Sequence, residues 1–439
     1  MQYPHQIAIA PLTKPPHATV RVPGSKSITN RALVLAALTA HETVIDGALQ
    51  SEDTEVMVDC LRRLGFTILP DWEAESIRVL HDSAQPTIPA SSADLYVANS
   101  GTTMRFLAAM VALGNGRYRL DGVPRMRERP IADLLNALDQ LGVKAVCEFN
   151  NGCPPVVIEA NGLPGGTVHI RGDTSSQFLS GLLMAGSMAR GDVIIIVDGP
   201  LVSVPYVSMT VAMMRQFGLS VFTGRAGQFA VHAPQTPKVR WHYLVEPDAS
   251  AASYFFGAAA ITGGRVTIPR LTKHCLQGDV RFLDVLNRMG CEEIASTCRP
   301  DFTSRREESI TVHGGPLRGI DVDMNDISDT VMTLAAVACF AEGPTTIRNV
   351  AHIRHKETDR LAALATELRR IGAKVDEFAD GLTITPAPLH GAVIQTYNDH
   401  RMAMSLALVG LKVPGIVIDN PACVAKTYPR FFDDLERLR

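Results

Sequence analysis

The sequence predicts an α/β protein of two domains, built from six repeats of about 75 residues. Two series of motifs support this prediction. In the first series an amphipathic helix ends in an apolar residue and a glycine, and a strand follows; the glycines are Gly65, Gly142, Gly218, Gly290 and Gly372. In the second series a strand leads through a tight polar turn into a helix that is apolar on nearly all sides; the turns lie around Ser27, Thr102, Ser176, Ser250, Asp329 and His400.

The order of elements within a repeat follows from these two series. Each repeat is expected to contain a strand, a buried helix, a strand, an outer helix and a hairpin of two strands. A helix that is apolar all round belongs inside a domain, whereas an amphipathic helix covers its surface. A glycine after the last helical turn suits a left-handed C-cap. A sixth outer helix, in YPRFFDDLERLR, closes the chain.

Three repeats around three buried helices make one domain, so six repeats make two. We expect repeats 1–3 to form a domain of residues 22–244, and repeats 4–6 to form a domain of residues 1–21 plus 245–439. The two crossings between them would be the proline-bearing stretch Ala233–Pro247 and the first strand, His17–Gly24. Two short crossings describe a hinge, with an active site expected in the cleft between the domains.

The composition excludes several classes of protein. Hydrophobic residues make up 46% and charged residues 20%, which is typical of a globular protein. A net charge of −3 gives no general attraction to nucleic acid or to an anionic membrane. The longest apolar run, Met402–Leu411, is far shorter than the ~20 residues of a membrane span. With no recognisable signal or transit sequence, we expect a soluble cytoplasmic protein.

The cysteines and the loops indicate no metal and no cofactor. The cysteines stand singly, without a C-x-x-C pair, and are expected to be reduced core thiols. They are Cys60, Cys147, Cys153, Cys275, Cys291, Cys298, Cys339 and Cys423. No loop has the spacing of a metal site, and no G-x-G-x-x-G turn opens a helix.

The loops of the first half indicate anion binding. Each repeat has two loops that enter a helix N-terminus, where free N–H groups and a partial positive charge favour anions. Pro23–Ser27 offers a lysine and serines, Asn99–Thr102 contains a glycine, and Pro124–Pro130 holds three arginines between two prolines. Repeat three offers Asp173–Gln177 and then Ser203–Tyr206. Taken singly, these residues are also explained as helix caps or solvated charges.

The loops of the second half add acids and bases. Asp326 and Asp329 come at the start of a buried helix, where either a general base or an ordinary N-cap is expected. Arg354–Arg360, Asn398–Arg401 and Ala425–Thr427 supply further charged side chains. The residues alone therefore predict an enzyme that acts on a polyanionic small molecule. Its acid–base groups would come from Asp329, Glu357, Lys356 and His400.

Ten motifs in register resemble the enolpyruvyl transferase family, and within it the branch whose acceptor is shikimate 3-phosphate. They are PGSKSITNRA, NSGTTMR, PRMRERPI, SSQFL, LVSVPY, QGDVRF, DMN-x-I-x-D, KETDRL, YNDHRMAM and AKTYP, between residues 23 and 429. The resemblance implies an inverse α/β prism of two domains, expected to be a monomer. It implies transfer of the enolpyruvyl group of phosphoenolpyruvate to the 5-hydroxyl of shikimate 3-phosphate. Neither nucleic acid nor membrane is an expected partner.

The resemblance also implies roles for individual residues. Asp329 would take the proton of the 5-hydroxyl and Glu357 would transfer protons at the methylene carbon, assisted by Lys26 and Lys356. The shikimate 3-phosphate site would comprise Lys26, Ser27, Arg31, Ser175, Ser176, Gln177, Ser203, Tyr206, Asp329, His352 and Lys356. The phosphoenolpyruvate site would comprise Lys26, Asn99, Gly101, Thr102, Arg129, Gln177, Arg360, Arg401 and Lys426. Gly101 is expected to leave room for the anion, because a Cβ there would project toward it.

Three positions depart from the pattern of the family. Ser100 replaces a common alanine, Phe106 a common proline and His352 a common asparagine. The family's phosphonate inhibitor glyphosate is expected to compete with phosphoenolpyruvate. Two alternatives remain: a UDP-N-acetylglucosamine enolpyruvyl transferase, whose reactive cysteine is missing from Pro124–Pro130, and an anion-binding protein without activity.

Overall fold

The computed structural model describes residues 3–39, 41–81, 86–224, 227–236, 242–296 and 308–439. The chain forms two compact units. The continuous unit comprises Gly24–Val245, and the split unit comprises Met1–Pro23 together with Glu246–Arg439. Cys298 and part of the proline-bearing stretch, residues 237–241, lie outside the described residues.

The continuous unit contains three repeats of the expected element order. Its helices are α1 (Lys26–Ala37), α2 (Glu52–Arg63), α3 (Gly101–Met110), α4 (Ala132–Gln140), α5 (Ser176–Gly186), α6 (Val204–Gln216) and the 3-10 helices η1 (Val111–Leu113) and η2 (Pro124–Glu128). Its strands are β3 (Thr43–Asp46), β4 (Thr67–Asp71), β5 (Ser76–Leu80), β6 (Ser92–Tyr96), β7 (Asn115–Asp121), β8 (Lys144–Cys147), β9 (Val156–Asn161), β10 (Gly166–Arg171), β11 (Val193–Asp198), β12 (Phe222–Thr223), β13 (Gln228–Val231) and β14 (His242–Leu244).

The split unit repeats this order in repeats 4 and 5, whereas the described residues of repeat 6 end at the outer helix without a hairpin. Its helices are α7 (Ala249–Thr262), α8 (Phe282–Met289), α9 (Val331–Ala338), α10 (Arg360–Arg370), α11 (His400–Gly410), α12 (Phe431–Glu436) and the 3-10 helices η3 (Gly278–Arg281), η4 (Asn325–Thr330), η5 (Ala351–His355) and η6 (Pro421–Lys426). Its strands are β1 (Gln6–Ile9), β2 (His17–Thr19), β15 (Arg265–Pro269), β16 (Glu292–Ser296), β17 (Ser309–His313), β18 (Asp321–Asp323), β19 (Thr345–Arg348), β20 (Lys374–Phe378), β21 (Gly381–Thr385), β22 (Val393–Ile394) and β23 (Ile416–Asp419).

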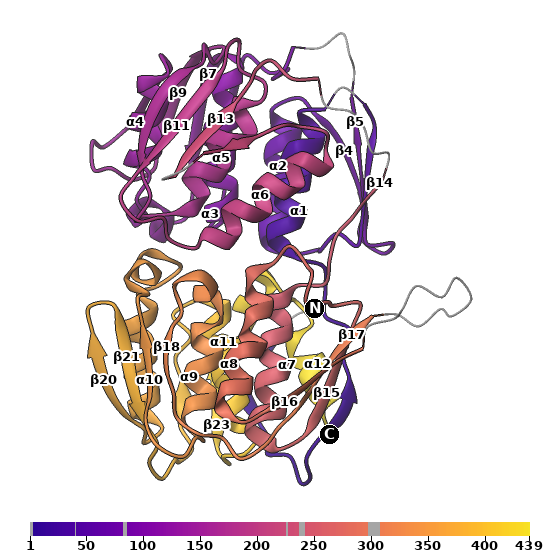
Figure 1. Ribbon diagram of the computed structural model, residues 1–439, viewed down its shortest axis with the longest axis vertical. Coiled ribbons are helices and arrows are strands. Elements are labelled where there is room, and N and C mark those ends of the chain that lie inside the picture. Colours follow the sequence, from indigo (N-terminus) through magenta and orange to yellow (C-terminus); the bar gives the residue numbers. More distant parts are fainter. Residues whose placement is uncertain (1–2, 40, 82–85, 225–226, 237–241, 297–307) are drawn as a thin grey trace. The chain divides into compact units, whose positions relative to one another are not determined.

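Each repeat forms one small mixed sheet, and three sheets surround the inner helices of each unit (Figure 1). In the sheet ordered β6-β7-β9-β8, the strands on either side of α3 are parallel, and the hairpin β8–β9 is antiparallel. Strands from outside a repeat complete some sheets. β14 pairs with β3 in the first repeat, while β2 pairs with β15 and β1 with β23 in the split unit.

The burial of the helices confirms the two helix classes. All residues of α3 and α11 are buried, because their alanine, leucine and methionine side chains meet packed elements on every side. α8 is amphipathic: Phe282, Leu283, Leu286 and Met289 are buried, and Arg288 is exposed. All five glycines of the first motif series have positive φ, between 79° at Gly218 and 112° at Gly290. They therefore end the outer helices as the sequence predicts.

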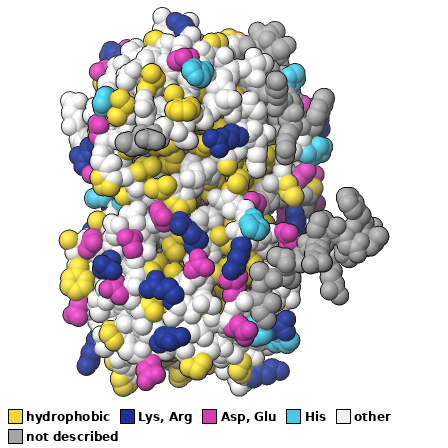
Figure 2. All heavy atoms as spheres, viewed as in Figure 1, with side chains coloured by type: hydrophobic (Ala, Val, Ile, Leu, Met, Phe, Trp, Pro, Cys, Tyr) yellow, Lys and Arg dark blue, Asp and Glu magenta, His cyan; other side chains and the backbone are white. Residues whose placement is uncertain are grey.

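Some boundaries differ from the prediction. The expected strand His17–Gly24 shortens to His17–Thr19, beyond which the Val20 N–H still donates to the Thr267 carbonyl. Pro23 has no N–H and cannot extend the ladder. No helix among the described residues is long and apolar enough to cross a membrane. On the face shown in Figure 2, basic and acidic side chains are interspersed, as a net charge of −3 leads one to expect.

Candidate active site

The continuous unit presents Lys26 as the first residue of α1. Its Nζ lies 3.2 Å from the Asp53 carboxylate, which is buried in the first turn of α2. Ser27 follows, and its carbonyl accepts a hydrogen bond of 2.9 Å from Arg31. The lysine is thus held near a helix N-terminus, where an anion is favoured.

Arg31 is buried among the helices of the continuous unit. Its Nε donates to Thr210 Oγ1 at 2.7 Å, and Nη2 donates to the Tyr206 carbonyl at 3.3 Å and to Ser180 Oγ at 3.4 Å. The Phe106 ring lies 5.0 Å from the guanidinium carbon, a cation–π distance. Burial lowers the pKa of Arg31 to about 10, so the group stays charged at neutral pH.

The start of α3 brings Asn99, Gly101 and Arg129 together. Arg129 Nη1 donates to the Asn99 carbonyl at 3.1 Å. A Cβ built on Gly101 would lie 2.4 Å from Arg129 Nη2 and 2.9 Å from Arg105 Nη1. A side chain at position 101 would therefore displace Arg129, and the expectation that this glycine leaves room for an anion stays a prediction.

Hydroxyl and amide groups gather at the starts of α5 and α6. Ser175 caps α5 by accepting from the Gln177 N–H, and Gln177 Nε2 donates to Thr102 Oγ1 at 3.3 Å, joining α5 to α3. Ser203 precedes α6 with φ 52° and ψ 47°, a left-handed conformation that costs a non-glycine residue energy. Ser176 is buried beside Ser175, and Tyr206 lies in the first turn of α6.

The split unit concentrates opposite charges around Arg360. This side chain is 1% exposed at the start of α10. Its Nε donates to Asp399 at 2.8 Å, Nη2 to Glu357 at 2.9 Å and Nη1 to Asp329 at 3.3 Å. Burial alone would lower the pKa of Arg360, but the three carboxylates outweigh burial and raise it. The guanidinium therefore holds Asp329 and Glu357 in place through ion pairs.

Arg401, in the first turn of α11, is the second cation of this cluster. Its Nη2 donates to Asp329 Oδ2 at 2.8 Å, and its Nη1 to Tyr254 Oη at 3.2 Å. Asp399 caps α11 by accepting from the Arg401 N–H at 2.9 Å. Asp329 thus lies between two guanidinium groups, within the 3-10 helix η4. It does not cap α9, which begins at Val331, so the alternative of an ordinary helix cap is wrong.

Lys426 and His400 are also buried in the split unit. Lys426 Nζ lies 3.9 Å from Glu357. Burial, with the positive charge of Arg401, lowers the pKa of His400 well below its ordinary value. His400 is therefore neutral at pH 7 and is not an imidazolium acid there, although its ring still carries one N–H and one acceptor nitrogen.

His352 lies in η5, just before Lys356. Its Nε2 is 2.9 Å from Ser328 Oγ, and the ring is buried. Burial, followed by the charge of Lys356, lowers the pKa of His352 to about 3. The histidine is a neutral hydrogen-bonding group here, which an asparagine could replace in kind.

Sequence reasoning missed several residues that hold these side chains. Asp399, Ser250 and Tyr254 contact Arg360 or Arg401, and Asp53 contacts Lys26. For Asp399, Ser250 and Asp53, the available signal was an acid or hydroxyl at or near the start of a helix, whereas Tyr254 lies beyond the first turn of α7 and gave no such signal. A cap and a partner for an arginine give the same signal, so the sequence alone does not separate them.

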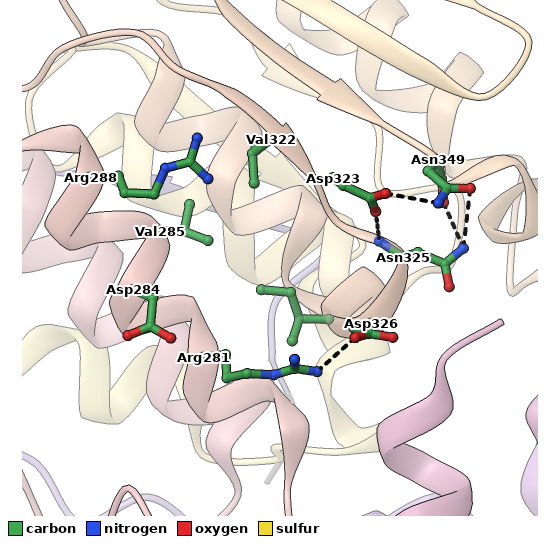
Figure 3. A pocket seen from close by; sticks show the side chains of 10 residues that line it. Arg281, Asp284, Val285, Arg288, Val322, Asp323, Asn325, Asp326 and Asn349 are labelled. Carbon is green, nitrogen blue, oxygen red and sulfur yellow. Dashed lines mark hydrogen bonds and ion pairs between the residues drawn. The ribbon is translucent and has the colours of Figure 1, made fainter.

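One pocket of about 410 Å³ lies beside η4 in the split unit (Figure 3). Asp326, one of the two aspartates considered as a base from the sequence, lines it, but no residue of the two expected substrate sites does. Its two arginines are engaged by protein groups, Arg281 with Asp326 and Arg288 with the Asp321 carbonyl. Among the described residues, no group of three or more histidine, cysteine, aspartate and glutamate side chains is arranged to hold a metal ion.

Comparison with known proteins decides the family. Residues 12–435 match the family described as EPSP synthase (3-phosphoshikimate 1-carboxyvinyltransferase). The chain belongs to this family. Similar relatives within it include the 3-phosphoshikimate 1-carboxyvinyltransferase of Nostoc punctiforme, 50% identical over 98% of this chain and 99% of the relative. The chloroplastic enzyme of Arabidopsis thaliana is 46% identical over 95% of this chain and 82% of the relative.

A solved structure of the EPSP synthase family has the same fold. The EPSP synthase of Acinetobacter baumannii aligns with a TM-score of 0.79 at 26% identity, over 99% of this chain and 98% of that one. The expected α/β class and the prism of six repeats are confirmed. The resemblance drawn from the ten motifs is confirmed as well.

Proposed function

We propose that the chain transfers the enolpyruvyl group of phosphoenolpyruvate to the 5-hydroxyl of shikimate 3-phosphate and releases phosphate. The observation that carries this proposal is Asp329, held as a carboxylate between Arg360 and Arg401. Family membership supports the reaction, since the relatives are named for it. The reaction belongs to the shikimate pathway of aromatic amino acid biosynthesis.

The proposed binding roles follow the charges. Phosphoenolpyruvate carries about three negative charges, and the guanidinium forks of Arg129, Arg360 and Arg401 suit its carboxylate and phosphate. Lys26 and Lys426 would add point charges. Shikimate 3-phosphate would bind to the hydroxyls and amide at the starts of α5 and α6. The other residues of the two expected substrate sites have, in this proposal, the binding roles that the resemblance implies.

The proposed chemistry needs two proton-transfer groups. In the addition step Asp329 takes the proton of the 5-hydroxyl, the oxygen bonds to C2 of phosphoenolpyruvate, and C3 gains a proton to become a methyl group. In the elimination step C3 loses a proton, the C2–O bond to phosphate breaks, and the double bond re-forms. Glu357 fits the acceptor at C3, because Arg360 keeps it a carboxylate, and Lys356 fits the donor.

Phosphate release tests this function. We expect release from phosphoenolpyruvate only when shikimate 3-phosphate is present, with one enolpyruvyl product formed per phosphate. Release with UDP-N-acetylglucosamine, or none with either acceptor, would contradict the proposal. The proposal includes that the protein acts as a monomer in the cytoplasm. Sedimentation of the purified protein tests the monomeric state.

A further inference from the structure

The motif QGDVRF has no role in the site described above, yet two of its residues are buried at the start of α7. Gln277 Oε1 accepts from the Ala249 N–H at 2.9 Å, and Nε2 donates to the Pro247 carbonyl at 2.7 Å. Asp279, in η3, accepts a short hydrogen bond from Ser250 Oγ. The motif therefore fixes the first turn of α7, the helix that faces Arg401.

Two side chains of α7 contact the Arg401 guanidinium. Ser250 and Tyr254 are one helical turn apart and so lie on the same face of the helix. Tyr254 Oη accepts from Arg401 Nη1 at 3.2 Å, and Ser250 Oγ accepts from Nη2 at 3.5 Å. With Asp329 as the third partner, the planar guanidinium is held at both terminal nitrogens.

We propose that Asp279, acting through Ser250, is a positioning residue that orients Arg401 toward phosphoenolpyruvate. A serine hydroxyl has one hydrogen. Because Ser250 gives that hydrogen to Asp279, its lone pairs face Arg401 and can only accept. This inference rests on the proposed function, since it assigns a support to a residue of the proposed phosphoenolpyruvate site.

The charge of Asp279 gives this support a pH dependence. Burial, and then the Asp329 carboxylate, raise the pKa of Asp279 to about 7, against the opposing effect of Arg401. The other charged group acting on it is Asp248, the N-cap of α7. Arg281 of η3 pairs with Asp326 of η4, and both line the pocket of Figure 3 with Asp284 and Arg288 of α8. Asp279 thus changes its charge near neutral pH, and an asparagine resembles its protonated form.

Kinetic measurements on matched variants test whether Asp279 and Ser250 position Arg401. We expect Ser250→Ala and Asp279→Ala to raise the KM for phosphoenolpyruvate about fivefold to tenfold, which corresponds to the net contribution of one ordinary hydrogen bond. The KM for shikimate 3-phosphate should change less than about twofold in both. Ser253→Ala is the control, because Ser253 is buried on the same helix but its hydroxyl faces Thr333 and the Ser250 carbonyl.

The pH profile separates positioning from simple stability. Wild type and Asp279→Asn should have the same kcat/KM for phosphoenolpyruvate below about pH 6. There the protonated Asp279 of the wild type and the asparagine of the variant are both uncharged and similar in shape. Above about pH 8 the wild type alone carries the carboxylate, and the two should differ by about fivefold. A ratio that is independent of pH would overturn the inference.

The outcomes are separable. If Asp279→Ala does not fold, judged by its thermal melt, then Ser250→Ala against Ser253→Ala decides: equal KM values for phosphoenolpyruvate overturn the inference, and a rise in Ser250→Ala alone supports it. If wild type turns over and no variant changes that KM, the inference fails while the proposed function stands. If wild type releases no phosphate, the proposed function fails and the inference falls with it.

Discussion

The two units hold their buried arginines in different ways. In the continuous unit, Arg31 donates to oxygens of Thr210, Ser180 and Tyr206. These oxygens are neutral, so they do not balance the positive charge of the guanidinium. In the split unit, Arg360 and Arg401 contact the carboxylates of Asp329 and Glu357. An arginine among neutral groups favours a bound anion, whereas an arginine among carboxylates fixes groups that exchange protons. Under the proposed function, the carboxylates that exchange protons therefore lie in the split unit, while both units contribute binding groups.

The largest expected effect tests binding by the continuous unit. Shikimate without its phosphate should be a poor acceptor, because Ser175, Ser176 and Ser203 would lose the group that we propose they bind. The kcat/KM should fall on the order of 10³-fold relative to shikimate 3-phosphate. Comparable values for the two acceptors would remove the phosphate site from this unit.

Asp329→Asn tests catalysis by the split unit. We expect turnover to fall at least ~10²-fold with little change in the binding of shikimate 3-phosphate, because the variant removes a base and keeps the shape. Asp326→Asn is the control, since Asp326 lies in the same 3-10 helix and pairs with Arg281 at the pocket. Turnover near that of wild type in Asp329→Asn would leave the split unit without its proposed base.

Gly101→Ala changes the binding of the donor from the continuous unit. The added Cβ would displace Arg129, so the KM for phosphoenolpyruvate should rise on the order of tenfold. Gly186→Ala is the control, because a Cβ there would make only ordinary contacts of 3.5 Å or more with Val193. Equal effects of the two substitutions would show that Arg129 has no special place in donor binding.

The acid stability of the split unit should depend on His352. The folded pKa of this histidine is about 3, so between pH 6.5 and 3 the unfolded chain binds a proton that the folded chain does not. Stability therefore falls as the pH falls through this window, by up to about 1.4 kcal/mol per pH unit from one group. His352→Asn should make the loss less steep in denaturant titrations at several pH values. An unchanged slope would contradict a buried neutral histidine.

The smallest expected effect concerns Phe106 in the continuous unit. Phe106→Leu removes the ring beside the Arg31 guanidinium and keeps an apolar side chain in α3. A cation–π contact contributes about 0.5–2 kcal/mol, so the KM for shikimate 3-phosphate should rise a few-fold. The KM for phosphoenolpyruvate should stay near its wild-type value. The reverse pattern would move Arg31 to the donor site.

The sequence predicted well what is local. The left-handed glycines such as Gly65 and Gly290 and the polar residues at helix starts depend on neighbours within a few positions, and the repeats are found because these local signals recur. The residues that hold the site depend on partners far along the chain. Arg31 contacts Thr210, 179 positions later, and Arg401 contacts Tyr254, 147 positions earlier. Such contacts arise from the packing of repeats against one another, which periodicity alone does not specify.

The pairing of β1 with β23 has a consequence for synthesis on the ribosome. Gln6 meets Asp419, 413 residues later, so the first strand has no partner in its sheet until the residues around Asp419 have been synthesised. The continuous unit is complete once Val245 has emerged, and chains generally fold domain by domain from the N-terminus. We therefore expect the nascent chain to carry a folded continuous unit preceded by a segment, Met1–Pro23, that has not yet folded. The split unit would fold last, when β1 of that segment pairs with β23.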